Sequence, residues 1–88
     1  MLGKKVQMME LEHQISQDRR RIAAGDRPVY HATWATSLDG GAVDVAIREL
    51  PIIHLFVPDE SGVLAGARAL IARTLGVDPS SFEVQPDA

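Results

Sequence analysis

Residues 49–84 constrain the fold of this chain more than any other stretch. They contain an apolar segment at residues 52–57, a helix-forming segment that ends at Gly76, and a short β-prone ending at residues 82–84. Residues 29–48 precede them and show the alternating pattern of a β-hairpin. With a helix at the N-terminus, this order predicts an α+β fold, in which a β-β-β-α-β module forms one mainly antiparallel sheet packed on one helix.

The hairpin is indicated by the tripeptide Asp-Gly-Gly at residues 39–41, since both central residues of a tight hairpin turn need positive φ, which Asp-Gly tolerates. The strand before it, residues 29–38, and the strand after it, residues 42–50, both alternate between apolar and polar side chains. The side chains that share the apolar faces of the two strands are Tyr30, Trp34, Leu38, Val43, Val45 and Ile47.

Residues 4–24 are predicted to form a helix that ends at Gly25, because good helix formers precede the glycine and the Asp-Arg-Pro at residues 26–28 prevents continuation. Apolar residues recur in this helix at spacings of three, four and seven, which gives one narrow apolar seam of Met8, Leu11, Ile15 and Ile22. An isolated helix of this length is marginal in water, so the seam is expected to bury against the chain's own domain or a second copy. The predicted organisation is an oligomerisation arm at residues 1–26 and a module at residues 28–86.

The strand at residues 52–57 is apolar on both faces apart from His54, and Pro51 before it is expected to interrupt pairing and turn the chain. A strand in a one-sheet domain gains a second cover only from a partner chain or from the N-terminal helix. We therefore expect self-association, as a homodimer or a higher homo-oligomer. The residues expected in that interface are Met8, Leu11, Ile15, Ile22, Ile52, His54 and Phe56.

A second helix is predicted to begin at Pro58-Asp59, with Asp59 or Ser61 as its N-cap, and to end at Gly76. Small residues at positions 62, 65, 66 and 69 either let another backbone approach closely or are merely small. The core-facing stripe of this helix is expected to consist of Val63, Ala67, Leu70, Ile71 and Leu75.

Composition and charge exclude several classes of function. The chain has no cysteine, which excludes a disulfide framework, a thiolate nucleophile and a cysteine-based zinc site. Residues 1–25 carry five basic and three acidic side chains, whereas the remainder carries four basic and nine acidic ones. A basic tip on an acidic body indicates a local electrostatic contact, not a protein that coats nucleic acid. No apolar run reaches the ~18 residues that span a bilayer, so we expect no membrane partner and a cytoplasmic location.

Two segments of the predicted module carry a recognisable pattern: residues 49–54 read Glu-Leu-Pro-Ile-Ile-His, and residues 75–84 read Leu-Gly-Val-Asp-Pro-Ser-Ser-Phe-Glu-Val. In these segments the chain resembles the HicB antitoxin family of small bacterial proteins. The resemblance covers about residues 28–86. The chain departs from the family's pattern at Ile52, where glycine is usual, in its added N-terminal helix, and in lacking a DNA-binding segment after Val84.

This resemblance implies a partial RNase-H-like fold, in which the last strand lies beside the first and parallel to it. It also implies a non-enzymatic module that binds another protein, such as a small basic toxin-like protein. Because of the departures, the resemblance does not decide whether the chain also binds an operator, which is a second role of many family members. The acidic residues expected to contact a basic partner are Asp44, Glu49, Asp59 and Glu60.

Catalysis is not expected from these residues. An RNase-H-like nuclease needs carboxylates that converge on two metal ions, but the first strand has no acidic residue before Asp39 and the second helix has none after Glu60. The histidines, His13, His31 and His54, fall on different predicted elements and lack the spacing of metal ligands. We therefore predict no catalytic residue, no metal site and no cofactor.

Nucleic-acid binding is the alternative function. Arg19, Arg20 and Arg21 could contact phosphates in a small regulatory or phage protein, although the same charges also complement the dipole at the end of the helix. No aromatic residue is interleaved with them for base stacking. A third possibility is an orphan copy of the fold with a structural or inhibitory role, which the sequence does not separate from an antitoxin-like protein.

Overall fold

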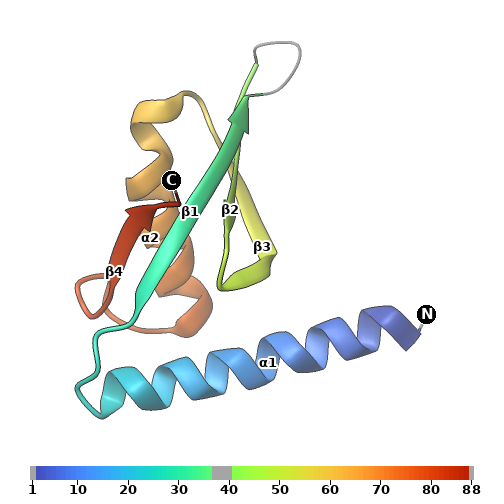
Figure 1. Cartoon of the computed structure of the whole chain (residues 1–88), viewed down its shortest axis with the longest axis vertical. Helices are drawn as coiled ribbons and strands as arrows, with labels where there is room; N and C mark the ends of the chain where they lie inside the picture. The colour runs from blue at the N-terminus through green and yellow to red at the C-terminus, as the bar shows by residue number, and fades with distance from the viewer. Residues whose placement is uncertain (1, 37–40, 88) are drawn as a thin grey trace.

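The computed structural model describes residues 2–36 and 41–87, with side chains described from residue 8 onward. Its elements are α1 (Leu2–Ala23), β1 (Val29–Thr36), β2 (Val43–Ile47), β3 (Leu50–Val57), a 3₁₀ turn (Glu60–Gly62), α2 (Val63–Leu75) and β4 (Glu83–Pro86). Figure 1 shows one sheet with α2 behind it and α1 crossing one end. The predicted α+β class and the predicted order of elements are confirmed.

The four strands lie in the order β3-β2-β1-β4. The pairs β1–β2 and β2–β3 are antiparallel, whereas β4 runs parallel to β1 with Tyr30 opposite Val84. The expectation that the last strand lies beside the first and parallel to it is confirmed. The antiparallel pairing of β1 with β2 agrees with the predicted hairpin, while its residues 37–40 lie outside the described part of the chain, Leu38 and most of the Asp-Gly-Gly turn included.

The core lies between one face of the sheet and α2. On α2 the buried residues are Val63, Ala67, Ile71 and Leu75, as the apolar spacing predicts, while Leu70 is only partly buried. Asp59 caps the 3₁₀ turn before α2, since its side chain accepts a hydrogen bond from the backbone N–H of Ser61, 2.9 Å away, whereas the N-cap of α2 itself is Gly62. The residues that fill the core from the sheet and from the connection into β4 are Tyr30, Ala32, Val43, Val45, Ile47, Leu50, Val57 and Phe82.

Gly66 is one of the small residues of α2 for which the structure gives a reason. A Cβ at this position would lie 3.0 Å from Val57 Cγ1 and 3.1 Å from Leu55 Cδ1, both on β3. The helix therefore lies so close to the strand that a side chain at position 66 would force Val57 or Leu55 to shift. The close approach is to the chain's own sheet, so this glycine does not mark an interface with another chain.

β3 begins earlier than the sequence predicts. The chain turns at Arg48 and Glu49, so Pro51 lies inside the strand instead of turning the chain. Residues 51–53 have no register partner on β2, because Ile47 pairs with Leu50 and Ala46 with His54. Proline has no N–H to donate and is tolerated at such an irregular edge. Pro51 does interrupt pairing, as expected, but the prediction that it turns the chain is wrong.

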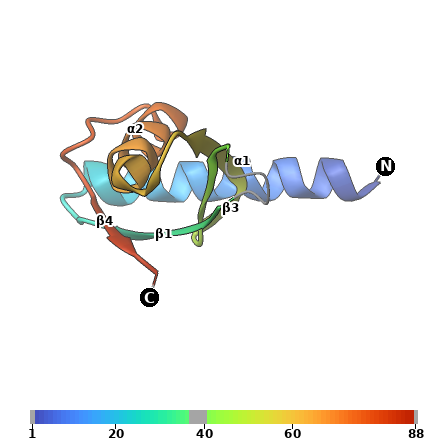
Figure 2. The same ribbon diagram turned by 90° about the horizontal axis from the view of Figure 1, so that it is seen from above.

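α1 packs across the end of the sheet where β1 begins (Figure 1, Figure 2). Leu11, Ile15 and Ile22 are partly buried against the core. The helix starts two residues before the predicted boundary and ends at Ala23. Its end is a Schellman motif: Gly25 has φ of 93°, and the N–H groups of Gly25 and Asp26 donate to the carbonyl oxygens of Ile22 and Arg21 at 3.1 and 2.9 Å.

Candidate interaction surface

The outer face of β3 carries large side chains that nothing in the described part of the chain covers. Phe56 is 63% exposed and Ile52 is 37% exposed, and His54 between them is also exposed. The His54 and Phe56 rings meet edge to face with centroids 5.9 Å apart. On β2, Asp44 lies opposite Phe56, and its Oδ1 is 3.4 Å from His54 Nδ1. The sequence predicted a cover on both faces of this strand, and α1 does not supply the second one.

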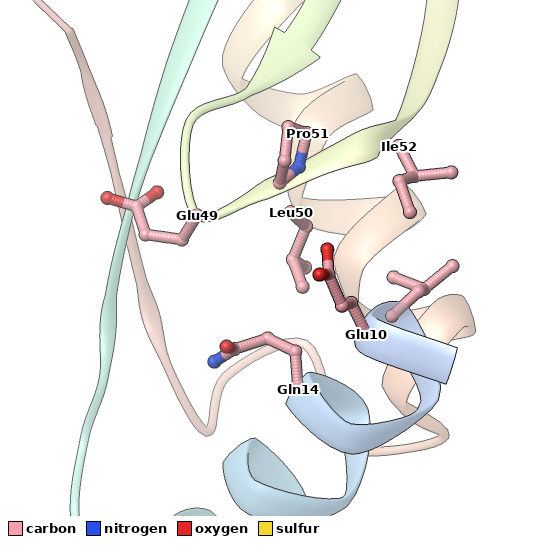
Figure 3. Close-up of a pocket in the computed structure, with 7 residues that line it drawn as sticks. Glu10, Gln14, Glu49, Leu50, Pro51 and Ile52 are labelled. Atoms are coloured by element: carbon pink, nitrogen blue, oxygen red, sulfur yellow. The ribbon is translucent and has the colours of Figure 1, made fainter. Parts of the chain in front are cut away.

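A groove separates α1 from the start of β3. Its volume is about 560 Å³, and Figure 3 shows Glu10 pointing from α1 toward Leu50, with Pro51 and Ile52 on the other side of the groove, while Gln14 extends from the same helix toward the side on which Glu49 lies. Leu11 and Glu49 also line the groove, and its apolar lining consists of Leu11, Leu50, Pro51 and Ile52. Because Ile52 belongs both to this groove and to the outer face of β3, the groove and that face are continuous.

Gln14 is held in one orientation by a buried carboxylate. Asp18 is only 2% exposed, and its two oxygens accept hydrogen bonds from Gln14 Nε2 at 2.9 Å and from the Tyr30 hydroxyl at 2.6 Å. A carboxylate accepts but cannot donate, so the amide nitrogen of Gln14 faces Asp18 and the amide oxygen is left for the groove. Burial raises the pKa of Tyr30, and the hydrogen bond and negative charge of Asp18 raise it further.

The carboxylate of Glu49 points away from the groove, toward β1 (Figure 3). Its two oxygens lie 2.7 Å from the backbone nitrogen and 2.5 Å from Nδ1 of His31. Arg48 Nε is 3.5 Å from the same carboxylate and donates from its Nη1 to Asp87 at 3.0 Å. Burial by itself would raise the pKa of Glu49, but the hydrogen bonds from His31 outweigh it and lower that pKa.

The acidic residues expected to bind a partner do not come together. Asp44 lies on the outer face of the sheet, Glu49 is in the turn next to α1, and Asp59 and Glu60 follow the opposite end of β3. Three of the four have internal partners: Asp44 has His54, Glu49 has His31, and Asp59 has Ser61. Hydrogen bonds from Ser61 lower the pKa of Asp59. The predicted set of four is thus split between two ends and one face of the sheet.

The arginines of α1 are exposed at its C-terminal end. Arg21 Nε lies 4.0 Å from Asp26 Oδ2. Successive helical residues point about 100° apart, so Arg19, Arg20 and Arg21 spread around the helix and do not form one stripe. Their neighbour Asp18 is buried and accepts hydrogen bonds from Gln14 and Tyr30.

The helix seam is divided between the core and solvent. Leu11, Ile15 and Ile22 pack on their own core, whereas Met8 is 54% exposed and Met9, which the seam did not include, is 67% exposed. The sequence reasoning also missed Asp18 and Gln14. The signal was present, because Asp18 follows Ile15 by three positions and Gln14 by four, which places all three on one helix face.

Within residues 2–36 and 41–87, no group of three histidine or acidic side chains is arranged to hold a metal ion. No helix in the same part of the chain is long and apolar enough to cross a membrane. Comparisons with protein-family models, with curated proteins and with solved structures give no match for this chain. The resemblance to HicB antitoxins therefore stays a prediction.

Proposed function

We propose that this chain is a non-enzymatic, HicB-like protein-binding module that self-associates through the outer face of β3. The observation that carries the proposal is the exposed row Ile52, His54 and Phe56 on an edge strand. Large apolar side chains that lie together on an exposed surface mark interaction sites, and an edge strand also offers unpaired backbone groups to another chain. The parallel placement of β4 beside β1 supports the HicB-like part of the proposal.

The exposed apolar area supplies a large part of what a dimer of two such chains needs. Met8 lies one helical turn from Leu11, which lines the groove beside Ile52, so Met8 and the β3 row flank the same corner of the molecule, whereas Met9 points to the other side of α1. With about 200 Å² for a fully exposed large side chain, the exposed parts of Met8, Ile52 and Phe56 amount to roughly 300 Å². A standard interface buries about 800 Å² per partner, a little over half of it apolar. The occupant that we propose for this surface is a second copy.

The function as an antitoxin-like binder requires a second, different protein. We expect that partner to be small and basic, because the described body of the chain is acidic and bears the groove beside Glu10. Tagged protein incubated with host lysate, with and without nuclease, tests this. The proposal predicts one small protein that survives nuclease and high salt and that forms a complex again from purified components.

The alternative is nucleic-acid binding through Arg19, Arg20 and Arg21, and the same experiment separates the two functions. Recovery of nucleic acid alone, abolished when all three arginines are changed to alanine, would contradict the protein-binding proposal. Phosphate contacts would also weaken steeply with salt, with a log–log slope near −0.9 for each phosphate neutralised on duplex DNA. The spread of the three side chains around α1 argues against a concerted contact of this kind.

A further inference from the structure

We infer that the groove between α1 and the start of β3 binds an arginine side chain of a partner protein. The inference deepens the proposed protein-binding role, on which it rests, by naming the chemistry that the partner presents. It concerns Glu10 and Gln14, which belong to neither the predicted interface nor the predicted acidic set.

The floor of the groove suits the aliphatic stem of a long side chain. Leu11, Leu50, Pro51 and Ile52 line it, and its volume of about 560 Å³ is in the range of sites that take small ligands. Arginine and lysine lay their methylene groups on apolar surface while the charged head reaches polar groups at the rim. A purely polar ligand would leave this floor without a partner.

The polar side chains that face the groove offer acceptors. Glu10 forms no hydrogen bond or ion pair with any residue in the described part of the chain, and it projects toward Leu50 and Pro51 (Figure 3). Gln14 presents its amide oxygen, since Asp18 holds the amide nitrogen. Glu49 also lines the groove, but its carboxylate points toward β1 and both of its oxygens are taken by His31, so it is not counted among the free acceptors. An anionic ligand would meet like charge and no cationic side chain here.

Two separate acceptors favour arginine over lysine. The guanidinium group carries five N–H donors in a planar fork and has no acceptor of its own, so it can reach a carboxylate and an amide oxygen together. Glu10 and Gln14 lie four positions apart on α1 and therefore on the same face of the helix. The buried negative charge of Asp18, behind Gln14, adds to the attraction for a cation.

Two pentapeptides test the inference: acetyl-Gly-Leu-Arg-Leu-Gly-amide, and the same peptide with citrulline, which keeps the shape of arginine and removes its charge. Each is titrated into the labelled full chain and followed by two-dimensional NMR. The arginine peptide is expected to shift the Gln14 side-chain amide and the backbone amides of Leu50 and Ile52 in a saturable way. Because hydrogen bonds to charged groups are the strong ones, the citrulline peptide should bind at least about fivefold more weakly.

Glu10→Gln should weaken the arginine peptide by a similar factor. Glu12→Gln is the matched control, since it removes the same charge from an exposed site of α1 that does not line the groove. Equal binding of the two peptides, equal weakening by the two variants, or the absence of any saturable shift at the groove would each overturn the inference. A strictly monomeric protein would contradict the proposed self-association and leave this titration unaffected, so the two failures are distinguishable.

Discussion

The hydrogen bond between Tyr30 and Asp18 is predicted to hold α1 on the sheet, and Tyr30→Phe tests it. The hydroxyl donates to a carboxylate at 2.6 Å, and both residues are almost completely buried. Removing the hydroxyl leaves one oxygen of a buried carboxylate without a donor. A hydrogen bond to a charged group contributes about 1.5–3 kcal/mol, and an unpaired buried charge adds to the loss, so we expect a cost of about 2–3 kcal/mol.

This cost is a large part of the stability of a chain of 88 residues, for which roughly 4–13 kcal/mol is typical. Urea unfolding at pH 7, followed by circular dichroism at one protein concentration, measures it. With a slope of about 1 kcal/mol per molar urea, the midpoint should fall by about 2 M. Asp18→Ala and the double variant complete a cycle, in which the coupling energy should exceed about 1 kcal/mol. A loss below about 0.5 kcal/mol for Tyr30→Phe, or a coupling energy near zero, would refute the reasoning.

Further predictions concern α2 and the Glu49 network. Gly66→Ala should destabilise the fold by about 1 kcal/mol, because the overlap with Val57 and Leu55 outweighs the gain in helix propensity. Gly62→Ala, whose Cβ would lie at an ordinary 3.7 Å from Val57, should change urea stability by less than about 0.5 kcal/mol; equal effects of the two would contradict this packing argument. Glu49→Gln should lower the free energy of unfolding by about 1 kcal/mol at pH 7, because the hydrogen bonds with His31 would lose their charged carboxylate partner. Since the pKa of Glu49 is lowered in the folded chain from 4.5, that difference is fully present above pH 4.5 and should vanish as the pH falls through the lowered value; a difference that persists at low pH would contradict it.

The local parts of the fold could be predicted from the sequence because their causes lie within a few residues. Gly25 and Gly76 end the two helices with left-handed backbones, as their positions after the last apolar residues indicate. The alternation in residues 43–47 gives the buried face of β2, and the spacing from Val63 to Leu75 gives the buried stripe of α2. These patterns follow directly from the periods of strand and helix.

Features that depend on distant contacts could not be predicted in the same way. Trp34 shares its strand face with Tyr30 but is 38% exposed. Alternation alone does not tell how many residues of β1 are covered by the core. The burial of Asp18 depends on a hydrogen bond from Tyr30. The carboxylate of Glu49 is engaged by His31, which lies eighteen positions away in the sequence. The groove needs α1 and the start of β3 side by side, which no local pattern in the sequence encodes.

Light scattering coupled to gel filtration tests the central claim, which is that the outer face of β3 joins two copies of the chain. At tens of micromolar, the parent protein should show about twice the 9.6 kDa of one chain, or a higher multiple. Phe56→Ser should shift it to the mass of one chain without loss of fold, whereas Leu64→Ser, which removes an exposed apolar side chain from α2, should leave the assembly intact. A parent protein that is strictly monomeric, or an assembly that Phe56→Ser leaves unchanged, would contradict the account.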